Sequence, residues 1–326
     1  MKRRELLILG AGAVLAPRLA LAQSRVPRIG FLLLQPLSEP PTRERQAFLD
    51  GLRDYGYVPG KNIELLYRSA ENEPEFLEPQ CQELVRQKVD LIATTGPGST
   101  IAARNTTRTI PIVFLAAGDP VGIGIVASLA RPGGNVTGVS FSSSELAGKR
   151  IELLREAVPA AKRIAFLWDE RNRNAQIEAQ AAMAAARRTG MVPEPIPLAT
   201  HADLTAALQR ISARKPDALY VMFAAAIVVD NRSAIAEFAL RHRLPLISGW
   251  GFMTDAGGLL SYAPDIPSIF RRGAYYVDRI LKGTKASELP VELPTTVELA
   301  LNLKTAKAIG LTIPPSLLLR ADRVIE

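Results

Sequence analysis

A short segment rich in glycine and hydroxyl side chains is the strongest candidate for binding chemistry in this 326-residue chain. It reads Thr95-Gly96-Pro97-Gly98-Ser99-Thr100 and directly follows the apolar run DLIAT. Proline suits the first turn of a helix, and the glycines let a ligand approach the backbone closely. Free N–H groups at a helix start, with hydroxyls beside them, favour a carboxylate. Capping of the helix alone explains the same residues, so both interpretations stand.

Two more candidates follow apolar runs in the first half of the chain. Gln35 comes after RIGFLLL, and Asp119 comes after PIVFLAAG. Ligands of open parallel α/β sheets sit outside the carboxyl ends of the strands, which is where both residues are expected. Asp119 is suited to accept a hydrogen bond from a ligand ammonium group. It is equally suited to cap the helix that begins after Pro120.

The second half of the chain offers an aromatic and a basic candidate. Trp168 ends the run RIAFLW, where its ring could stack on a planar ligand or pack beneath a helix. Arg171 follows closely and could grip an anionic group, or belong to a solvated loop. Further candidates lie at the ends of apolar runs or in the turns after them: Asn172, Met222, Phe223 and Trp250.

Residues for catalysis are scarce. The two histidines, His201 and His242, are far apart in sequence, and neither belongs to a cluster with metal-ligand spacing. Cys81 is the only cysteine and lies in a helical pattern, so it is interpreted as a packing residue. The sequence carries no nucleophile elbow, zinc-protease or phosphate-loop motif. We therefore expect no enzyme activity, no metal and no cofactor.

The elements that must position these residues alternate along the chain. Short runs of apolar and β-branched residues are separated by amphipathic segments of helical period, which is typical of repeated βα units on a parallel sheet. Two similar half-sets of this kind predict an α/β fold with two doubly wound parallel-sheet lobes and a ligand cleft between them. We assign 27–141 plus about 251–283 to lobe one, and 142–250 plus about 284–326 to lobe two.

The first 22 residues are interpreted as an export signal. Three basic residues precede an apolar run, and the pattern Ala20-Leu21-Ala22 offers a cleavage site. The pair Arg3-Arg4 also fits a twin-arginine signal. A membrane anchor is the alternative, but the apolar stretch is shorter than the ~20 residues that span a bilayer. No cysteine follows the cleavage site for lipid attachment, so we expect a periplasmic protein.

Charge gives little support to nucleic-acid binding. The formal net charge is +8, and the signal holds four basic residues and one acidic residue, which leaves +5. The remaining basic residues are spread over helical faces without interleaved aromatic side chains. We expect most of them to be solvated.

Several long blocks of the chain resemble a known family. They are LRDYGYVPGKNIELLYRSAE, TTGPGSTIAA, GDPVGIGIVASLARPGGNVTG, LLSYAPDIPSIFRRGAYYVDRILKG and NLKTAKAIGLTIPPSLL. Together they are similar to the tryptophan/tyrosine-type periplasmic solute-binding proteins of ABC importers. The resemblance spans essentially the whole chain after the signal. It implies a type I periplasmic-binding fold whose two lobes close on a ligand.

The resemblance also implies partners and a role. It implies a monomer that captures a small solute, such as an aromatic or other amino acid or a carboxylate, and delivers it to an ABC permease driven by an ATPase. Contact with the membrane would then occur only through the permease. A periplasmic sensor that presents its ligand-bound form to a membrane receptor is the alternative function. The sequence does not separate these two roles.

Overall fold

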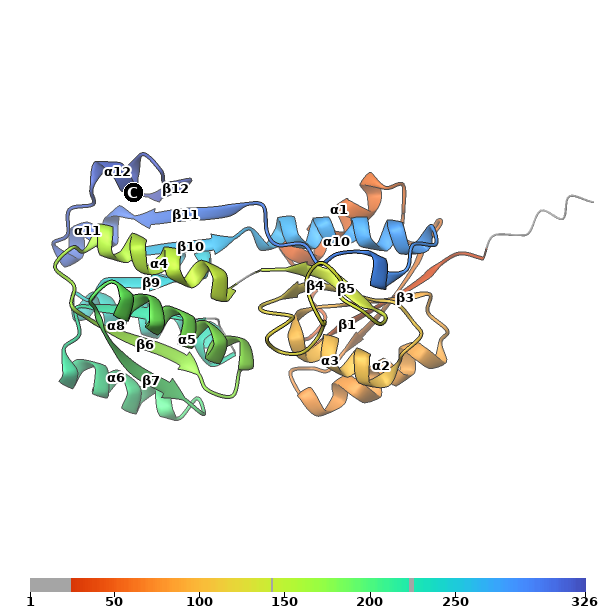
Figure 1. Ribbon diagram of the computed structural model, residues 1–326, viewed down its shortest axis with the longest axis horizontal. Helices are drawn as coiled ribbons and strands as arrows, with labels where there is room; N and C mark the ends of the chain where they lie inside the picture. The colour runs from red at the N-terminus through yellow and green to blue at the C-terminus, as the bar shows by residue number, and fades with distance from the viewer. Residues whose placement is uncertain (1–24, 142, 223–225) are drawn as a thin grey trace, which may run out of the picture.

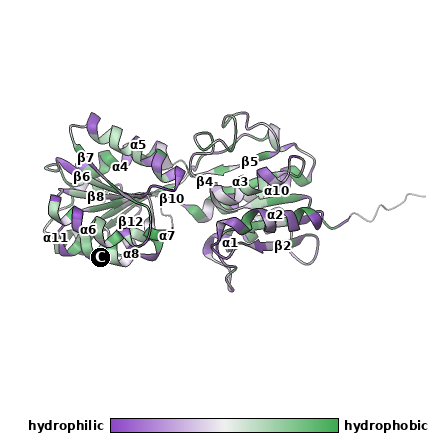
Figure 2. Cartoon of the chain, turned by 90° about the horizontal axis from the view of Figure 1, so that it is seen from below, coloured by the Kyte–Doolittle hydropathy of each residue, from purple (hydrophilic) through white to green (hydrophobic). Residues whose placement is uncertain are grey.

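Two α/β lobes lie side by side in the computed structural model, which describes residues 25–141, 143–222 and 226–326 (Figure 1). The expected export signal and the candidate Phe223 lie outside these residues. The strands of each lobe run between helices, and Figure 2 shows hydrophobic strands inside and hydrophilic stretches on the helices outside. This layering confirms the α/β class expected from the alternating pattern.

The first sheet has the strand order β2-β1-β3-β4-β5, and all its pairings are parallel. Its apolar strands are almost entirely buried because helices cover both faces. The backbones of β4 and β5 approach each other closely at Gly138, which pairs with Phe114. Gly138 has φ of +152°, and a Cβ atom there would lie 2.0 Å from the Phe114 carbonyl oxygen. The strands are β1 (Arg28–Leu33), β2 (Glu64–Ser69), β3 (Leu91–Thr94), β4 (Ile112–Ala117) and β5 (Val136–Ser140).

Two separate apolar clusters hold helices against the first sheet. On one face α1 (Arg43–Asp54) and α10 (Ile266–Leu281) pack against each other and against the cluster around Phe31 and Phe48. On the other face, α2 (Leu77–Arg86) and α3 (Gly96–Thr106) cover a cluster that includes Cys81. Cys81 is fully buried and burial raises its pKa, which confirms its interpretation as a packing residue.

The second sheet has the order β12-β11-β10-β9-β8-β6-β7. Every pairing is parallel except that of β10 with β11, because β11 enters from the other lobe and runs back along β10. Its strands are β6 (Arg163–Asp169), β7 (Val192–Leu198), β8 (Ala218–Val221), β9 (Leu246–Ser248), β10 (Leu260–Pro264), β11 (Val297–Asn302) and β12 (Arg323–Ile325).

Helices cover both faces of the second sheet as well. One apolar cluster holds α4 (Ser143–Ala157), α5 (Arg173–Arg188), α11 (Leu303–Ile309) and α12 (Pro315–Leu318). Another holds α6 (Asp203–Arg214), α7 (Ala226–Asp230), α8 (Arg232–Arg241) and α9 (Gly251–Asp255). The run IVVDNRSAIAEFALRH therefore forms two helices that meet at Asn231, rather than one.

The sheet pairings correct the expected place of one segment. We assigned about 251–283 to lobe one, but β10 pairs with β9 and β11 and so belongs to the second sheet. Only α10 returns to the first lobe, so the crossover falls at Asp265, between β10 and α10. The short helix η2 (Ala286–Glu288) also stays with the first lobe, where Val139 forms a bridge with Glu292. The apolar run GLLSYAP carries no signal of which sheet it joins.

Candidate ligand-binding site

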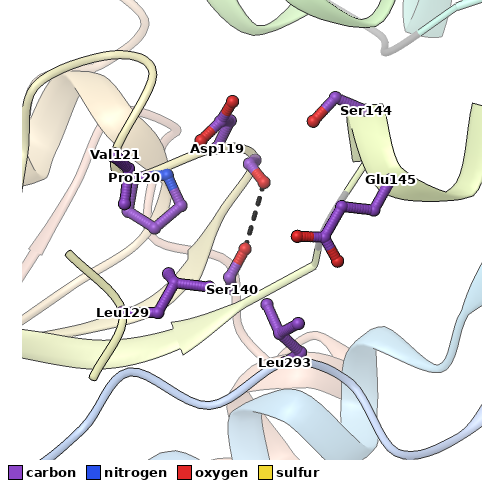
Figure 3. A pocket seen from close by; sticks show the side chains of 9 residues that line it. Asp119, Pro120, Val121, Leu129, Ser140, Ser144, Glu145 and Leu293 are labelled. Carbon is purple, nitrogen blue, oxygen red and sulfur yellow. Dashed lines mark hydrogen bonds between the residues drawn. The ribbon is translucent and has the colours of Figure 1, made fainter. Parts of the chain in front are cut away.

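A cavity of about 240 Å³ lies where the two lobes face each other. It is bounded by the ends of β4 and β5, by the first turn of α4, and by the crossover that leads to β11 (Figure 3). Lobe one and lobe two therefore both contribute to its wall. The lining residues are Gly118, Asp119, Pro120, Val121, Leu129, Ser140, Ser144, Glu145 and Leu293.

Carboxylates give this cavity its electrostatic character. The Asp119 side chain accepts a hydrogen bond from the backbone N–H of Gly122 at 2.8 Å, which fixes its direction at the end of β4. Glu145 stands in the first turn of α4, where the helix dipole favours an acidic side chain. Ser144 lies beside it, and none of the lining side chains is basic. The cavity is therefore suited to a cationic group such as an ammonium.

The two lobes touch directly beside this cavity. The backbone N–H of Asp119 donates to Oδ1 of Asn174, in the first turn of α5, at 3.2 Å. A Cβ atom on Gly118 would lie 2.6 Å from Cγ of Asn174, so a larger residue there would force the Asn174 side chain to shift. The rings of Phe141 and Trp250 also meet edge to face, with centroids 5.7 Å apart. The two lobes are therefore in direct contact beside the cavity.

A second cavity of about 220 Å³ lies within lobe one, at the carboxyl ends of β1 and β3. Phe31, Leu33 and Phe270 form an apolar floor, and polar residues surround its mouth. Gln35 and Thr95, both predicted from the sequence, line this cavity rather than the one between the lobes. The full lining is Phe31, Leu33, Gln35, Pro36, Ser38, Thr42, Glu44, Arg45, Thr95 and Phe270.

The predicted segment 95–100 forms the start of α3, as the sequence indicated. Gly96 has φ of +77°, and Gly98 is exposed. Thr100 is engaged in the fold, because its Oγ1 lies 2.8 Å from that of Thr94 and bonds the Gly96 carbonyl at 2.7 Å. The buried hydroxyls of Thr95 and Ser99 have no hydrogen-bond partner among the described residues. Capping by their side chains is therefore absent there, and both remain candidates for ligand contact.

The lobe-two candidates that the structure describes line neither of these two cavities. Trp168 is only 9% exposed and packs in the core, and Met222 is fully buried there. Asn172 caps α5, because its side chain accepts from the N–H groups of Asn174 and Ala175. The Arg171 side chain is exposed, with Nε 3.7 Å from Asp169 Oδ1. Their roles as ligand contacts stay predictions.

A buried polar network supports the hinge side of lobe two. Glu178 Oε1 accepts from Arg150 Nη1 at 2.9 Å and from the Tyr220 hydroxyl at 2.8 Å, and Ser143 donates to its other oxygen. Arg150 Nε also donates to the Tyr262 carbonyl in β10 at 2.8 Å. The network thus ties the start of α4 and the end of β10, the elements next to two of the crossovers.

Burial and charge both act on this network. Burial raises the pKa of Tyr220 well above its usual value. Burial alone would lower the pKa of Arg150, but the neighbouring Tyr220 and Glu178 raise it overall, so the guanidinium stays charged. A paired charge in this position fixes the geometry of the first turn of α4, which carries Ser144 and Glu145 to the cavity.

Sequence reasoning missed several of the lining residues. Ser144 and Glu145 come three and four residues after the run NVTGVSF, so the strand-end argument applied to the other runs would have found them. Arg45 and Asn174 come from helices, and their approach to a cavity or to the other lobe depends on tertiary packing. Leu293 belongs to a crossover that shows no local signal of its position.

Two features are absent from the described residues. No group of three or more His, Cys, Asp or Glu side chains is placed to hold a metal ion there. Within the same ranges, no helix combines the length and the apolar character needed to cross a membrane.

Known proteins resemble this chain in sequence and in fold. A tyrosine-binding protein from Clostridioides difficile is 27% identical over 269 residues, which cover 82% of this chain and 77% of that protein. A conserved domain protein from Vibrio cholerae has a TM-score of 0.84 and 28% identity, covering 92% of this chain and all of that one. An ABC domain from Streptococcus pneumonia in complex with L-Trp shares the fold, with a TM-score of 0.82, 24% identity, and coverage of 92% and 99%.

The family model of the ABC transporter substrate binding proteins matches residues 33–325, which is nearly all of the described chain. The matched span includes all the lining residues of both cavities except Phe31, and all the strands except most of β1. The chain therefore belongs to the ABC transporter substrate binding protein family.

Proposed function

We propose that this protein is the periplasmic substrate-binding subunit of an ABC importer and captures an amino acid between its lobes. The observation that carries the proposal is the cavity walled by both lobes, with Asp119 on one side and Glu145 on the other. A ligand held there contacts both lobes at once. It therefore stabilises the closed arrangement more than any open one, which is what hinge closure requires.

The charges of the cleft support an amino-acid ligand. Two carboxylates in a described lining that includes no basic residue favour an ammonium group, since charge-assisted hydrogen bonds to carboxylates are among the strongest. The similar protein that binds tyrosine supports an aromatic amino acid in particular.

Delivery would follow capture without any chemical step. The closed form would dock onto a membrane permease, whose ATPase supplies the energy of transport, and the binding protein would act as a monomer. Export by the N-terminal 22 residues would place the protein on the periplasmic side, where the solute arrives. The Arg150 network would keep the hinge side of lobe two rigid while the lobes move.

Thermal unfolding with a panel of amino acids, aromatic acids and sugars tests this function. A ligand at 100 times its dissociation constant adds about 2.7 kcal/mol to the free energy of unfolding, which is a readily measured shift. We expect aromatic amino acids to raise the unfolding temperature and sugars to leave it unchanged. A protein shown to be ligand-free that responds to no amino acid would contradict the proposal.

A further inference from the structure

The wall of the lobe-one cavity includes a buried arginine whose guanidinium has N–H groups that donate to no other described residue. Arg45 is 5% exposed and lines this cavity. Its Nη2 donates to the Ser38 carbonyl and to Glu39 Oε1 at 3.0 Å, but neither Nε nor Nη1 donates to any group among the described residues. A buried guanidinium that keeps free donors beside a cavity is suited to an oxygen acceptor from outside the chain.

The fold holds Arg45 in this position for a local reason. Thr42 caps α1 by accepting the backbone N–H of Arg45 at 3.2 Å, which places Arg45 in the first turn at the cavity wall. Its guanidinium carbon lies 5.6 Å from the centre of the Tyr67 ring, so an aromatic face stabilises the charge. The orientation of the guanidinium is therefore fixed before any ligand arrives.

Two other polar groups surround the same mouth. The buried Thr95 hydroxyl has no partner among the described residues, and the Glu44 carboxylate lines the cavity on the α1 side. A hydroxyl group can accept from Arg45 and from Thr95 while it donates to Glu44. A carboxylate could not donate and would be repelled by Glu44, so this arrangement favours a hydroxyl over an anion.

The apolar floor of the cavity indicates which chemical group of the ligand bears that hydroxyl. Phe31, Leu33 and Phe270 supply apolar surface, two of them aromatic. A volume of about 220 Å³ exceeds the ~150 Å³ of an engineered apolar cavity that takes up benzene, so a six-membered ring fits. We propose that this cavity is a subsite for a hydroxylated aromatic ring, in which Arg45, Thr95 and Glu44 select the hydroxyl.

The position of the subsite agrees with one ligand that reaches both cavities. The lobe-one cavity lies at the ends of β1 and β3, the cavity between the lobes lies at β4 and β5, and β3 pairs directly with β4. Neighbouring strands are about 4.8 Å apart, which puts the two cavities roughly 10 Å from each other along the sheet edge. This inference rests on the proposed function, because it places the side chain of the ligand whose ammonium group the cleft holds.

Affinity ratios of matched ligands test the subsite with the full-length protein. The dissociation constants are measured by titration calorimetry for L-tyrosine against L-phenylalanine, and for 4-hydroxyphenylacetate against phenylacetate. In the wild-type protein we expect the hydroxylated member of each pair to bind at least about tenfold more tightly, as expected for a hydrogen bond to a charged group. The Arg45→Met and Thr95→Val variants should bring both ratios close to one.

Two further comparisons separate an effect on the subsite from an effect on folding. Arg43→Met on the same helix is the control, because Arg43 is exposed and lines neither cavity, and it should leave the ratios unchanged. Thr95→Val removes a hydroxyl that has no hydrogen-bond partner in the described part of the chain, so this variant should fold as well as the wild type even if Arg45→Met does not.

Each outcome distinguishes the subsite from the proposed function. Wild-type ratios near one, or ratios that survive both Arg45→Met and Thr95→Val, would overturn the subsite while amino-acid capture stands. Tighter binding of phenylacetate than of 4-hydroxyphenylacetate would mean that Arg45 holds a carboxylate and would also overturn it. If the wild type binds neither L-tyrosine nor L-phenylalanine, both the subsite and the capture of aromatic amino acids fail.

Discussion

Replacing Glu178 by leucine removes the acceptor of the buried network and leaves Arg150 as an unpaired cation. Glu178 is fully buried and accepts from Arg150 at 2.9 Å, from Tyr220 at 2.8 Å and from Ser143. Removal of one partner of a buried ion pair typically costs about 3–5 kcal/mol, mainly because the remaining charge stays desolvated. That is a large part of the ~5–15 kcal/mol by which folded proteins are stable.

Urea unfolding followed by circular dichroism measures this cost. With a slope of about 3 kcal/mol per molar urea, the expected loss moves the midpoint down by more than about 1 M. Lys149→Met is the matched control on the same helix, because Lys149 pairs with Glu152 at 3.0 Å on the exposed surface. Exposed pairs contribute less than about 1 kcal/mol, so the control should shift the midpoint little.

A double-mutant cycle separates the ion pair from general damage to the core. Arg150→Met should be as harmful as Glu178→Leu, because each leaves one buried charge alone. The double variant leaves none, so it should cost at least about 2 kcal/mol less than the sum of the two single changes. Additive losses, or a Glu178→Leu midpoint equal to that of the control, would refute the assignment of this network as a coupled ion pair.

Three other variants or reagents probe the cleft, the core and the network. Gly118→Ala should weaken amino-acid binding at least about tenfold, because the new Cβ would lie 2.6 Å from the Asn174 side chain of the other lobe. The radius of gyration measured by small-angle X-ray scattering should also increase. Gly148→Ala is the control and should change neither quantity, because a Cβ atom there meets open space. The buried Cys81 thiol should react with a thiol reagent only in denaturant, and labelling of the native protein at the rate of a free thiol would contradict its burial. Burial raises the pKa of Tyr220 well above its ordinary value of 10.0. Above pH 10, the unfolded state therefore loses a proton that the folded state keeps. The free energy of unfolding then falls by about 1.4 kcal/mol per pH unit because of this group. Titration of urea midpoints above pH 10 should show a shallower fall in Tyr220→Phe, and identical slopes would sink this assignment.

Much of the fold followed from local patterns in the sequence. The runs RIAFLWD and VPEPIPL are strands at the residues expected, and the segment from Ile266 to Leu281 is one helix, as its period indicates. Period and apolar character are properties of neighbouring residues, so a single sequence reveals them. The partner of a strand is not such a property, which is why β10 was expected in the wrong lobe and the antiparallel pairing of β11 was not anticipated.

Some residues of the candidate site could likewise be predicted from the sequence, and others could not. Strand ends predicted Gln35, Thr95 and Asp119, and all three line a cavity, because the carboxyl edge of a parallel sheet is fixed by topology alone. Side chains that arrive from helices, such as Arg45 and Asn174, depend on how those helices pack. Trp168 illustrates the limit of the rule, since its side chain belongs to the core although it lies one residue from a strand end.

The central claim is that a solute is captured by contacts from both lobes. Titration calorimetry with L-tyrosine tests it, using the wild-type protein and two variants that each remove one charge. Asp119→Asn changes the wall in lobe one, and Glu145→Gln changes the wall in lobe two, with little change in shape. The account predicts one binding site per chain and an affinity that falls about tenfold or more in each variant. No binding to the wild type, or undiminished affinity in both variants, would contradict it.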